Sequence, residues 1–453
     1  MAKTKDMTVG SPTKLLIEFT LPMMFGNFFQ QAYSIVDTIV VGRFVGVEAL
    51  AAVGNAAWLD WLVMGIVLGL SQGFTIHMSQ RFGAQDYDGL RKTVAMSSIA
   101  SAVFAVSMSL LSLTALRPVL ELMNVPDNTI DMAQGYLTII YSCTIIIVAY
   151  NLVFSILRAL GDSKTPLYAM VIASVVNIVG DLLLVCVFEM GVNGAAIATV
   201  FAQFCALIYC LRAFLKLKVS RPKRSDWTID FGLMKRLIGL GMPIAFQNGI
   251  ICVGGLVLQS IINQFGYIFA AGIAAGNKVC GLMEVSGIAL GAASSTFTGQ
   301  NLGAQKYGRI RDGIRSAAII SIVLAAIVGS IVIVFGKQIL MLFLSGEPDV
   351  VQGALDASYP YIVIMAISMF MLYLLYVYRS ALQGMGDTTS PMLSGILELI
   401  ARIAFALILP RFLQEFGIYI AEVSAWFSAG IMLMAVFFYR MYKMGLYGKN
   451  RLE

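Results

Sequence analysis

The stretch MSQRFGAQDYDGLRK (residues 78–92) returns in altered form as TGQNLGAQKYGRIRD (residues 298–312). Two further pairs follow the same order: SILRALGDSKTPL (155–167) with SALQGMGDTTSPM (380–392), and TLPMMFGNF (20–28) with GMPIAFQNG (241–249). The separation is about 220–225 residues in each pair. The chain is therefore expected to contain two copies of one structural unit.

The composition indicates that both copies lie in a lipid bilayer. Of 453 residues, 59% are hydrophobic and 12% are charged, whereas soluble proteins carry about a quarter charged residues. The mean hydropathy is +0.83. The net charge of +6 is expected to come from basic cytoplasmic loops, so no nucleic-acid partner is predicted.

A transmembrane helix needs about 20 apolar residues, and this criterion predicts an all-α integral membrane protein with twelve spans. The predicted spans are 15–44, 51–78, 93–117, 132–157, 166–188, 193–215, 233–264, 269–297, 313–344, 358–383, 390–411 and 416–441. Each copy would contain six spans in the same orientation. The two six-helix lobes should therefore be related by a pseudo-two-fold axis along the membrane normal, with a central cleft between them.

The distribution of Lys and Arg predicts the orientation. One set of connections contains only Arg43, Arg117, Lys337 and Arg411, and the alternate set contains nearly all other Lys and Arg residues. Both termini are therefore expected in the cytoplasm. The most basic connection divides the chain into an N-terminal lobe (1–217), a basic cytoplasmic linker (218–232) and a C-terminal lobe (233–453).

Acidic residues inside the spans are costly in lipid and usually face a functional interior. Asn177 and Asp181 are four residues apart, so they share one helix face. Counting from the outer turns, Asp37, Asp181 and Thr199 lie at a similar depth, about 12–15 Å below the outer surface. These four residues are predicted to form one polar pocket in the N-terminal lobe.

The predicted pocket suits cation coupling. Its oxygen ligands match a hard cation, so the same four residues are a candidate Na⁺ site. Two close carboxylates in low dielectric also repel each other when both are ionised, so the pair can bind and release a proton near physiological pH. The coupling ion is either H⁺ or Na⁺, no other cofactor is expected, and a network that only joins the helices is the alternative.

The C-terminal copy lacks the carboxylates of this pocket. The repeat offset places Arg402 where the first copy has Asn177, and Ala406 where it has Asp181. Glu398 and Arg402 are expected to pair with each other as i and i+4 neighbours. Asp60 and Glu422 are expected near the outer ends of their spans, where water can reach them.

Other residues are candidates for bending and substrate contact. Pro22 interrupts the first span and can bend it, and Pro243 matches it in the seventh. Aromatic and amide side chains suit flat amphipathic ligands, although packing alone would also explain them. The residues expected to line a substrate cleft are Phe28, Gln31, Tyr33, Gln247, Asn248 and Glu284.

Other functional classes are disfavoured. An enzyme would need a nucleophile–base pair or metal ligands, and the chain has one histidine, so no catalytic residues are predicted. Nothing resembles a selectivity filter, which disfavours a channel. The repeated GAQ and GD motifs at the cytoplasmic helix ends are interpreted as scaffold, with Asp162 and Asp387 as helix caps.

The whole chain resembles the multidrug and toxic compound extrusion (MATE) family. The resemblance rests on the duplicated twelve-span pattern, on QRFGAQ and QNLGAQ after the second and eighth spans, on RALGDSKTP, and on NIVGDLLLV followed by GVNGAAIAT. It implies cation-coupled export of amphipathic, often cationic compounds. It also implies a cation site at Asp37, Asn177, Asp181 and Thr199, and a bending first helix at Pro22.

The chain departs from the NorM-like branch of this family, in which carboxylates of spans 7 and 10 take part in Na⁺ binding. Span 7 has Gln247 and Asn248 instead, and span 10 has Tyr373, Tyr376, Tyr378 and Arg379. A Na⁺ site in the C-terminal lobe is therefore not expected.

The sequence thus predicts a multi-pass antiporter of the plasma membrane, expected to be a monomer. Its expected partners are a small amphipathic substrate and the lipid bilayer. A lipid-linked precursor flippase or a narrow-specificity metabolite exporter of the same superfamily is the alternative.

Overall fold

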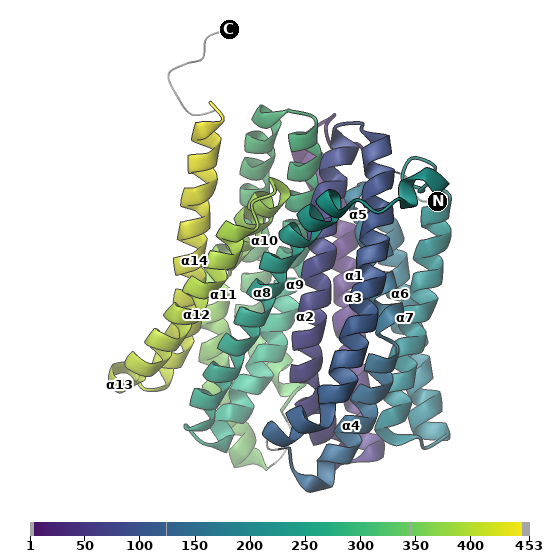
Figure 1. The fold of residues 1–453 in the computed structure, drawn as a ribbon. Helices are drawn as coiled ribbons and strands as arrows, with labels where there is room; N and C mark the ends of the chain where they lie inside the picture. The colour runs from purple at the N-terminus through teal and green to yellow at the C-terminus, as the bar shows by residue number, and fades with distance from the viewer. Residues whose placement is uncertain (1–3, 124, 345–346, 446–453) are drawn as a thin grey trace. The chain divides into compact units, whose positions relative to one another are not determined.

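The computed structural model describes residues 4–123, 125–344 and 347–445, and every regular element in this part of the chain is helical (Figure 1). The chain divides into two compact units. Unit 1 contains Leu21–Ala245 and the described residues up to Asp6, and unit 2 contains Met7–Thr20 and the described residues from Phe246. The chain ends, residues 1–3 and 446–453, lie outside the described residues.

Unit 1 is built from the first half of the helices. It contains α1 (Pro12–Val40) from Leu21 on, η1 (Val41–Val45), α2 (Val47–Gly83), α3 (Tyr87–Leu122), α4 (Asp127–Ser142), α5 (Thr144–Ala159), α6 (Lys164–Asp181), η2 (Leu182–Val187), α7 (Gly191–Leu215), η3 (Arg224–Trp227) and the beginning of α8 (Phe231–Asn263). η1 and η2 are π-helical turns and η3 is a 3₁₀ turn.

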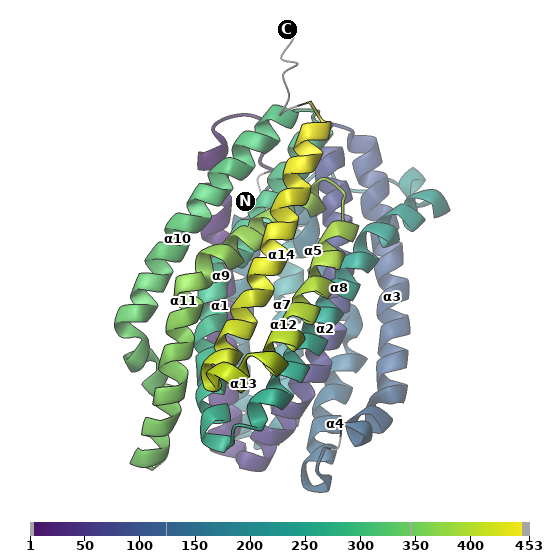
Figure 2. The same cartoon turned by 90° about the vertical axis from the view of Figure 1, so that its left-hand side faces the viewer.

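Unit 2 is built from the second half. It contains the rest of α8, then α9 (Tyr267–Gly303), α10 (Tyr307–Met341), α11 (Pro348–Gly384), α12 (Thr389–Ile408), α13 (Pro410–Leu413) and α14 (Glu415–Lys443). α12 packs along α14, and the short α13 lies at the turn between them (Figure 2).

The helices agree with the predicted membrane spans. Among the described residues, 10 helices are long and apolar enough to cross a membrane, and a bent pair, α4 and α5 at 53°, would make 11. α1 has 29 residues and corresponds to the first predicted span, although Asn27, Gln30 and Gln31 lower its hydropathy. Each of the twelve predicted spans therefore corresponds to a helix or to the bent pair.

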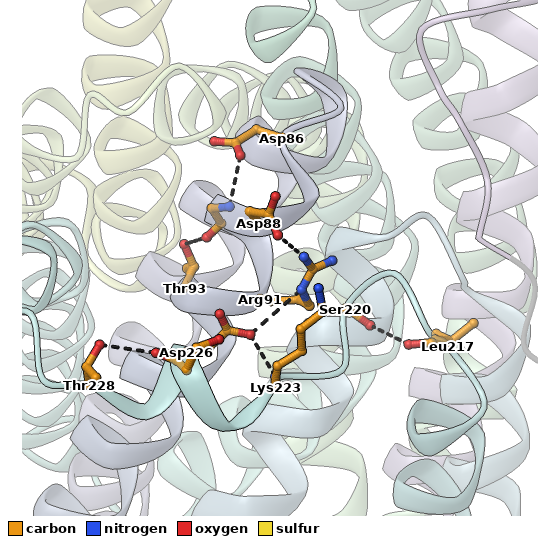
Figure 3. Close-up of polar contacts among 11 residues, drawn as sticks. Asp86, Asp88, Arg91, Thr93, Leu217, Ser220, Lys223, Asp226 and Thr228 are labelled. Atoms are coloured by element: carbon orange, nitrogen blue, oxygen red, sulfur yellow. Dashed lines mark hydrogen bonds and ion pairs between the residues drawn. The ribbon is translucent and has the colours of Figure 1, made fainter.

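The division between the units differs from the predicted lobe boundaries, because it falls inside α1 and α8 instead of inside the basic connection. That connection folds onto unit 1 (Figure 3). Arg91 Nε on α3 lies 3.7 Å from Asp226 Oδ2 of η3, and Lys92 Nζ donates to Thr228 Oγ1 at 3.0 Å. Residues 218–230 are thus attached to α3 by side-chain contacts.

The repeated motifs shape the helix ends as expected for a scaffold. The Asp162 carboxylate accepts from the Thr165 backbone N–H at 3.0 Å, and Asp387 accepts from Ser390 N–H at 3.0 Å. Both aspartates therefore cap the helices that follow them, as predicted.

The QNLGAQ motif has a further role in unit 2, because it binds the segment Met7–Gly10. The Met7 N–H donates to Gln300 Oε1 at 2.8 Å, and the Asn301 amide donates to the Met7 carbonyl at 3.2 Å. Arg309 Nη1 donates to the Gly10 carbonyl at 2.9 Å.

Close backbone contact between α2 and the first part of α8 explains why that part belongs to unit 1. A Cβ at Gly73 would lie 2.4 Å from Gly241 Cα, and one at Gly69 would lie 2.4 Å from the Ala245 nitrogen. Small residues permit this approach between membrane helices.

The Gly73→Ala substitution is expected to lower stability by about 1–3 kcal/mol, because the new methyl group would overlap backbone that cannot move aside easily. Gly54→Ala on the same helix is the matched control, since a Cβ at Gly54 would have no atom within 4 Å. Thermal unfolding of the purified proteins in detergent measures both effects. Equal melting temperatures for the two variants would contradict the close contact.

Candidate functional site

Asp37 lies in the last turn of α1, in unit 1. Its side chain is half-buried, and its Oδ1 atom is inaccessible to solvent and has no hydrogen-bond partner among the described residues. Directly after α1 the backbone continues as the π-helical turn η1. The carboxylate therefore lies where the regular α-helix of α1 ends.

Asn177 and Asp181 lie on α6, with exposed fractions of 1% and 0%. Asn177 Nδ2 donates to Thr199 Oγ1 of α7 at 3.3 Å. α6 ends at Asp181, and the chain continues as the second π-helical turn, η2. Asn177 thus links α6 to α7, one turn from a carboxylate that is fully buried.

The carboxyl groups of Asp37 and Asp181 lie within electrostatic range of each other. Neither oxygen of Asp181 has a hydrogen-bond partner in the described part of the chain. Two ionised carboxylates offer only acceptors to each other. A proton or a cation between them would satisfy these buried oxygens, so the donor set fits either coupling ion.

The two π-helical turns pack against each other beside these carboxylates. Apolar side chains surround them, including Val40 and Val41 from the α1 end and Val185 from η2. π-Helical turns are rare and are often found at functional sites. The sequence did not predict them, because no residue pattern distinguishes a π turn from the adjoining α-helix.

Asp60 is a further acidic residue that the sequence analysis placed wrongly. α2 begins at Val47, so Asp60 lies about 20 Å along the helix, and its Oδ1 atom is buried without a hydrogen-bond partner among the described residues. Tyr33 and Tyr136 lie within electrostatic range of Asp37, Asp60 and Asp181. The expectation of a hydrated position near the outer end of the span is therefore incorrect.

The residues predicted to line a substrate cleft are found in different environments. Phe28 is 51% exposed, Gln31 and Asn248 are half-buried, and Tyr33 lies beside the Asp37 pocket. Gln247 is 1% exposed and its Nε2 donates to the Pro391 carbonyl at 2.8 Å. Gln247 therefore joins α8 to α12 inside unit 2, and its assignment to a cleft is corrected.

Pro22 lies inside α1, as predicted, and Pro243 lies inside α8. Each proline is two residues or fewer from the point at which its helix passes from one unit to the other. The structure shows each helix as one continuous element, and bending at Pro22 stays a prediction.

The predicted pair of Glu398 and Arg402 is wrong. Glu398 pairs with Arg379 of α11, and Arg402 pairs with Glu422 of α14 at 2.9 Å. Helix spacing alone predicted the pair within α12, but the facing helices supply other partners. Glu422 lies about two turns from the beginning of α14, near the end of the helix as expected, and it forms a part-buried ion pair with Arg402.

Glu284 lies on α9 in unit 2. Its Oε2 accepts a hydrogen bond from the Tyr376 hydroxyl at 2.9 Å. The structure therefore places Glu284 among polar groups of unit 2, within electrostatic range of Glu398, Arg402 and Glu422.

No group of three or more His, Cys, Asp or Glu side chains that could hold a metal ion occurs among the described residues. The candidate Na⁺ site contains only two carboxylates, so the absence of such a group does not bear on it. Na⁺ binding at this site stays a prediction.

These features define a duplicated, multi-pass helical membrane protein with paired carboxylates inside one repeat. The MatE family model matches residues 22–183 and again residues 243–408. The chain therefore belongs to the MatE family, whose members are transporters. The two separate matches coincide with the two repeats recognised in the sequence.

Curated relatives carry transporter names. The chain is 29% identical over 352 residues to "Probable multidrug resistance protein YpnP" of Bacillus subtilis (strain 168), covering 77% of this chain and 78% of the relative. It is 23% identical over 310 residues to a "FAD transporter" of Shewanella oneidensis (strain ATCC 700550 / JCM 31522 / CIP 106686 / LMG 19005 / NCIMB 14063 / MR-1), covering 66% and 68%.

The fold is similar to that of solved transporters. One structure, described as the outward-facing conformation of a multidrug resistance MATE family transporter of the MOP superfamily, has a TM-score of 0.92 and 23% identity. The match covers 98% of this chain and 99% of that one. At this identity the likeness establishes the fold.

The buried contact of Gln247 leads to a prediction about stability. Gln247→Leu is expected to destabilise the protein by about 0.5–1.5 kcal/mol, because it removes the buried hydrogen bond to the Pro391 carbonyl, which keeps the Ser394 hydroxyl as a donor. Gln264→Leu, at an exposed position just after α8, is the control and should change stability little. Thermal unfolding of both variants in detergent is the measurement. Equal melting temperatures would contradict the structural role of Gln247.

Proposed function

We propose that this protein is a secondary active antiporter that exports amphipathic, often cationic small molecules across the plasma membrane. An H⁺ or Na⁺ gradient would drive export through alternating access. The observation that carries the proposal is the pair Asp37 and Asp181, in which Oδ1 of Asp37 and both carboxylate oxygens of Asp181 are buried without a hydrogen-bond donor among the described residues. Membership in a transporter family supports the same reading.

The pocket is suited to coupling because its charge is unbalanced when empty. Two ionised carboxylates in low dielectric repel each other, and a proton or Na⁺ removes much of that repulsion. Asn177 and Thr199 already contact each other at 3.3 Å and offer an amide and a hydroxyl oxygen beside the carboxylates. Loading and release of the ion would therefore favour different arrangements of α1 and α6.

α1 is the element that can carry this change along the chain. It contains Asp37 near one end and Pro22 in its interior. The proline ring removes one backbone hydrogen bond and permits a bend there. A change in the charge of the pocket would then shift the position of α1, which also carries the exposed aromatic side chain of Phe28.

The membrane orientation belongs to the same proposal. Basic residues are concentrated in one set of connections, so both termini are expected in the cytoplasm. The protein is expected to act as a monomer with a small-molecule substrate.

A narrow-specificity metabolite exporter is the second candidate, because one relative is named an FAD transporter. A flippase for lipid-linked precursors would need unpaired basic groups for a pyrophosphate. In the described structure, the buried arginines Arg379 and Arg402 each pair with a glutamate, which disfavours that alternative.

The Asp37→Asn and Asp181→Asn variants are expected to reduce gradient-driven ethidium export by about tenfold or more, since a loss of about 1.4 kcal/mol in ion binding already corresponds to tenfold. Everted vesicles would be energised by a pH gradient alone and by a Na⁺ gradient alone. The gradient that supports export by the wild type identifies the coupling ion.

Asp131→Asn is the matched control, because Asp131 lies on α4 of the same unit with its side chain 80% exposed. It should export like the wild type. Export at wild-type rates by both pocket variants would refute the coupling role of the pair. A wild type that exports no organic cation under either gradient would favour the metabolite exporter.

A further inference from the structure

Unit 2 contains a buried charge cluster that the coupling pocket does not involve. Three carboxylates, from Glu284, Glu398 and Glu422, lie within electrostatic range of one another, together with the guanidinium group of Arg402. Arg379 is the second cation and pairs with Glu398. With every group ionised, the cluster has one negative charge more than it has positive charges.

The uncompensated carboxylate is that of Glu284. Its described partner is the Tyr376 hydroxyl, which donates at 2.9 Å. No Lys or Arg forms an ion pair with Glu284 within the described ranges of the chain, whereas Glu398 and Glu422 each have an arginine. A neutral hydroxyl stabilises a buried carboxylate much less than a cation does.

Arg402 lies between alternative partners. Its Nη2 donates to Glu422 of α14 at 2.9 Å, and its Nε is buried without a hydrogen-bond partner among the described residues. Glu398 lies four residues earlier on the same helix, at a spacing that lets the two side chains meet. The Glu398 carboxylate uses Oε1 for Arg379, so its second oxygen can receive Arg402.

The repeat gives this arginine a particular position. Aligning the GD motifs of the two copies, Gly161 and Asp162 with Gly386 and Asp387, places Arg402 at the position of Asn177. In unit 1, Asn177 reaches from α6 to Thr199 of α7. In unit 2, Arg402 makes the corresponding contact from α12 to α14. A guanidinium group that belongs to the chain thus lies where the first copy has its candidate ion site.

Gly254 of α8 provides the space for this side chain. A Cβ on Gly254 would lie 2.9 Å from Arg402 Nη1 and 3.2 Å from Leu399 Cδ1. Aligning Pro22 with Pro243 places Gly254 at the position of Tyr33 in the first copy. The exchange of a large aromatic residue for glycine therefore accompanies the exchange of Asn177 for arginine.

We propose that Arg402 is a resident cation that competes with a monovalent organic cation for the carboxylates Glu284 and Glu422. When the substrate's positive charge binds beside Glu284, Arg402 moves from Glu422 to Glu398. Arg402 would then share Glu398 with Arg379, and the ligand's charge would take the place of Arg402 near Glu422, so the ligand's charge can decide the balance. This inference rests on the proposed export of cations and assigns the place at which the protein binds their positive charge.

If Arg402 competes with the ligand, its removal should change cation binding in the opposite direction to the removal of one partner of a structural ion pair. Removing one partner of a structural pair weakens the protein and its binding. Removing a competitor strengthens cation binding. Arg402→Gln is expected to bind tetraphenylphosphonium about tenfold more tightly, Glu284→Gln about tenfold more weakly, and Arg402→Lys, which keeps a cation, within about twofold of the wild type.

The measurement is equilibrium binding of tetraphenylphosphonium to purified full-length protein in lipid nanodiscs, without any ion gradient. Lys337→Gln is the control, because this lysine lies on α10 over the Tyr359 ring and outside the cluster. The affinity of this variant for tetraphenylphosphonium should equal that of the wild type. Thermal unfolding checks that each variant is folded. A folded Arg402→Gln protein that binds no more tightly than the wild type would overturn the inference.

A second variant covers the case in which Arg402→Gln does not fold. Arg402→Gln combined with Glu422→Gln removes the competitor without leaving its partner unpaired, and should bind more tightly than Glu422→Gln alone, because the two variants lack the same carboxylate. A folded double variant that binds no more tightly than Glu422→Gln also overturns the inference and leaves the proposed function intact. A wild type that binds no organic cation overturns both proposals.

Discussion

The burial of Asp181 without a positive partner is the constraint on which unit 1 depends. Its side chain is fully buried and its oxygens have no donor in the described structure, so the surrounding helices must supply compensation of another kind. Asp37 brings a second carboxylate, and Asn177 and Thr199 bring uncharged polar groups. In the proposed mechanism, an added proton or cation would stabilise this arrangement, which is the property that a coupling site requires.

Unit 2 satisfies the same constraint with arginines. Its buried glutamates on α12 and α14 pair with Arg379 and Arg402, so these charges are compensated within the chain. The two copies of one helical arrangement thus have different electrostatics: one has a pair of carboxylates without an ion-pair partner among the described residues, and the other has a nearly balanced cluster. The remaining carboxylate, Glu284, is hydrogen-bonded to the Tyr376 hydroxyl and has no arginine partner among the described residues.

Much of this organisation could be predicted from the sequence, because helix geometry fixes distances along a helix. Spacing put Asn177 and Asp181 on one face, and counting from a shared turn put Thr199 at the same depth. Spacing could not show which neighbouring helix each face meets. For that reason the partners of Glu398 and Arg402 were predicted incorrectly, Gln247 was assigned to a cleft although it joins α8 to α12, and Asp60 was placed too near the surface when the start of α2 was misjudged.

Coupling also needs a mechanical element, and the continuity of α1 and α8 provides a candidate. Each helix begins in one compact unit and ends in the other, with a proline close to the crossing point. A rigid helix transmits a displacement along its length, whereas a missing hydrogen bond at proline localises the bend. In the proposed mechanism, the charge state of Asp37 would act on one end of α1, and the position of Pro22 would determine where along the helix a bend is localised. Coupling would then depend on the stiffness of α1 as much as on the affinity of the carboxylate pair.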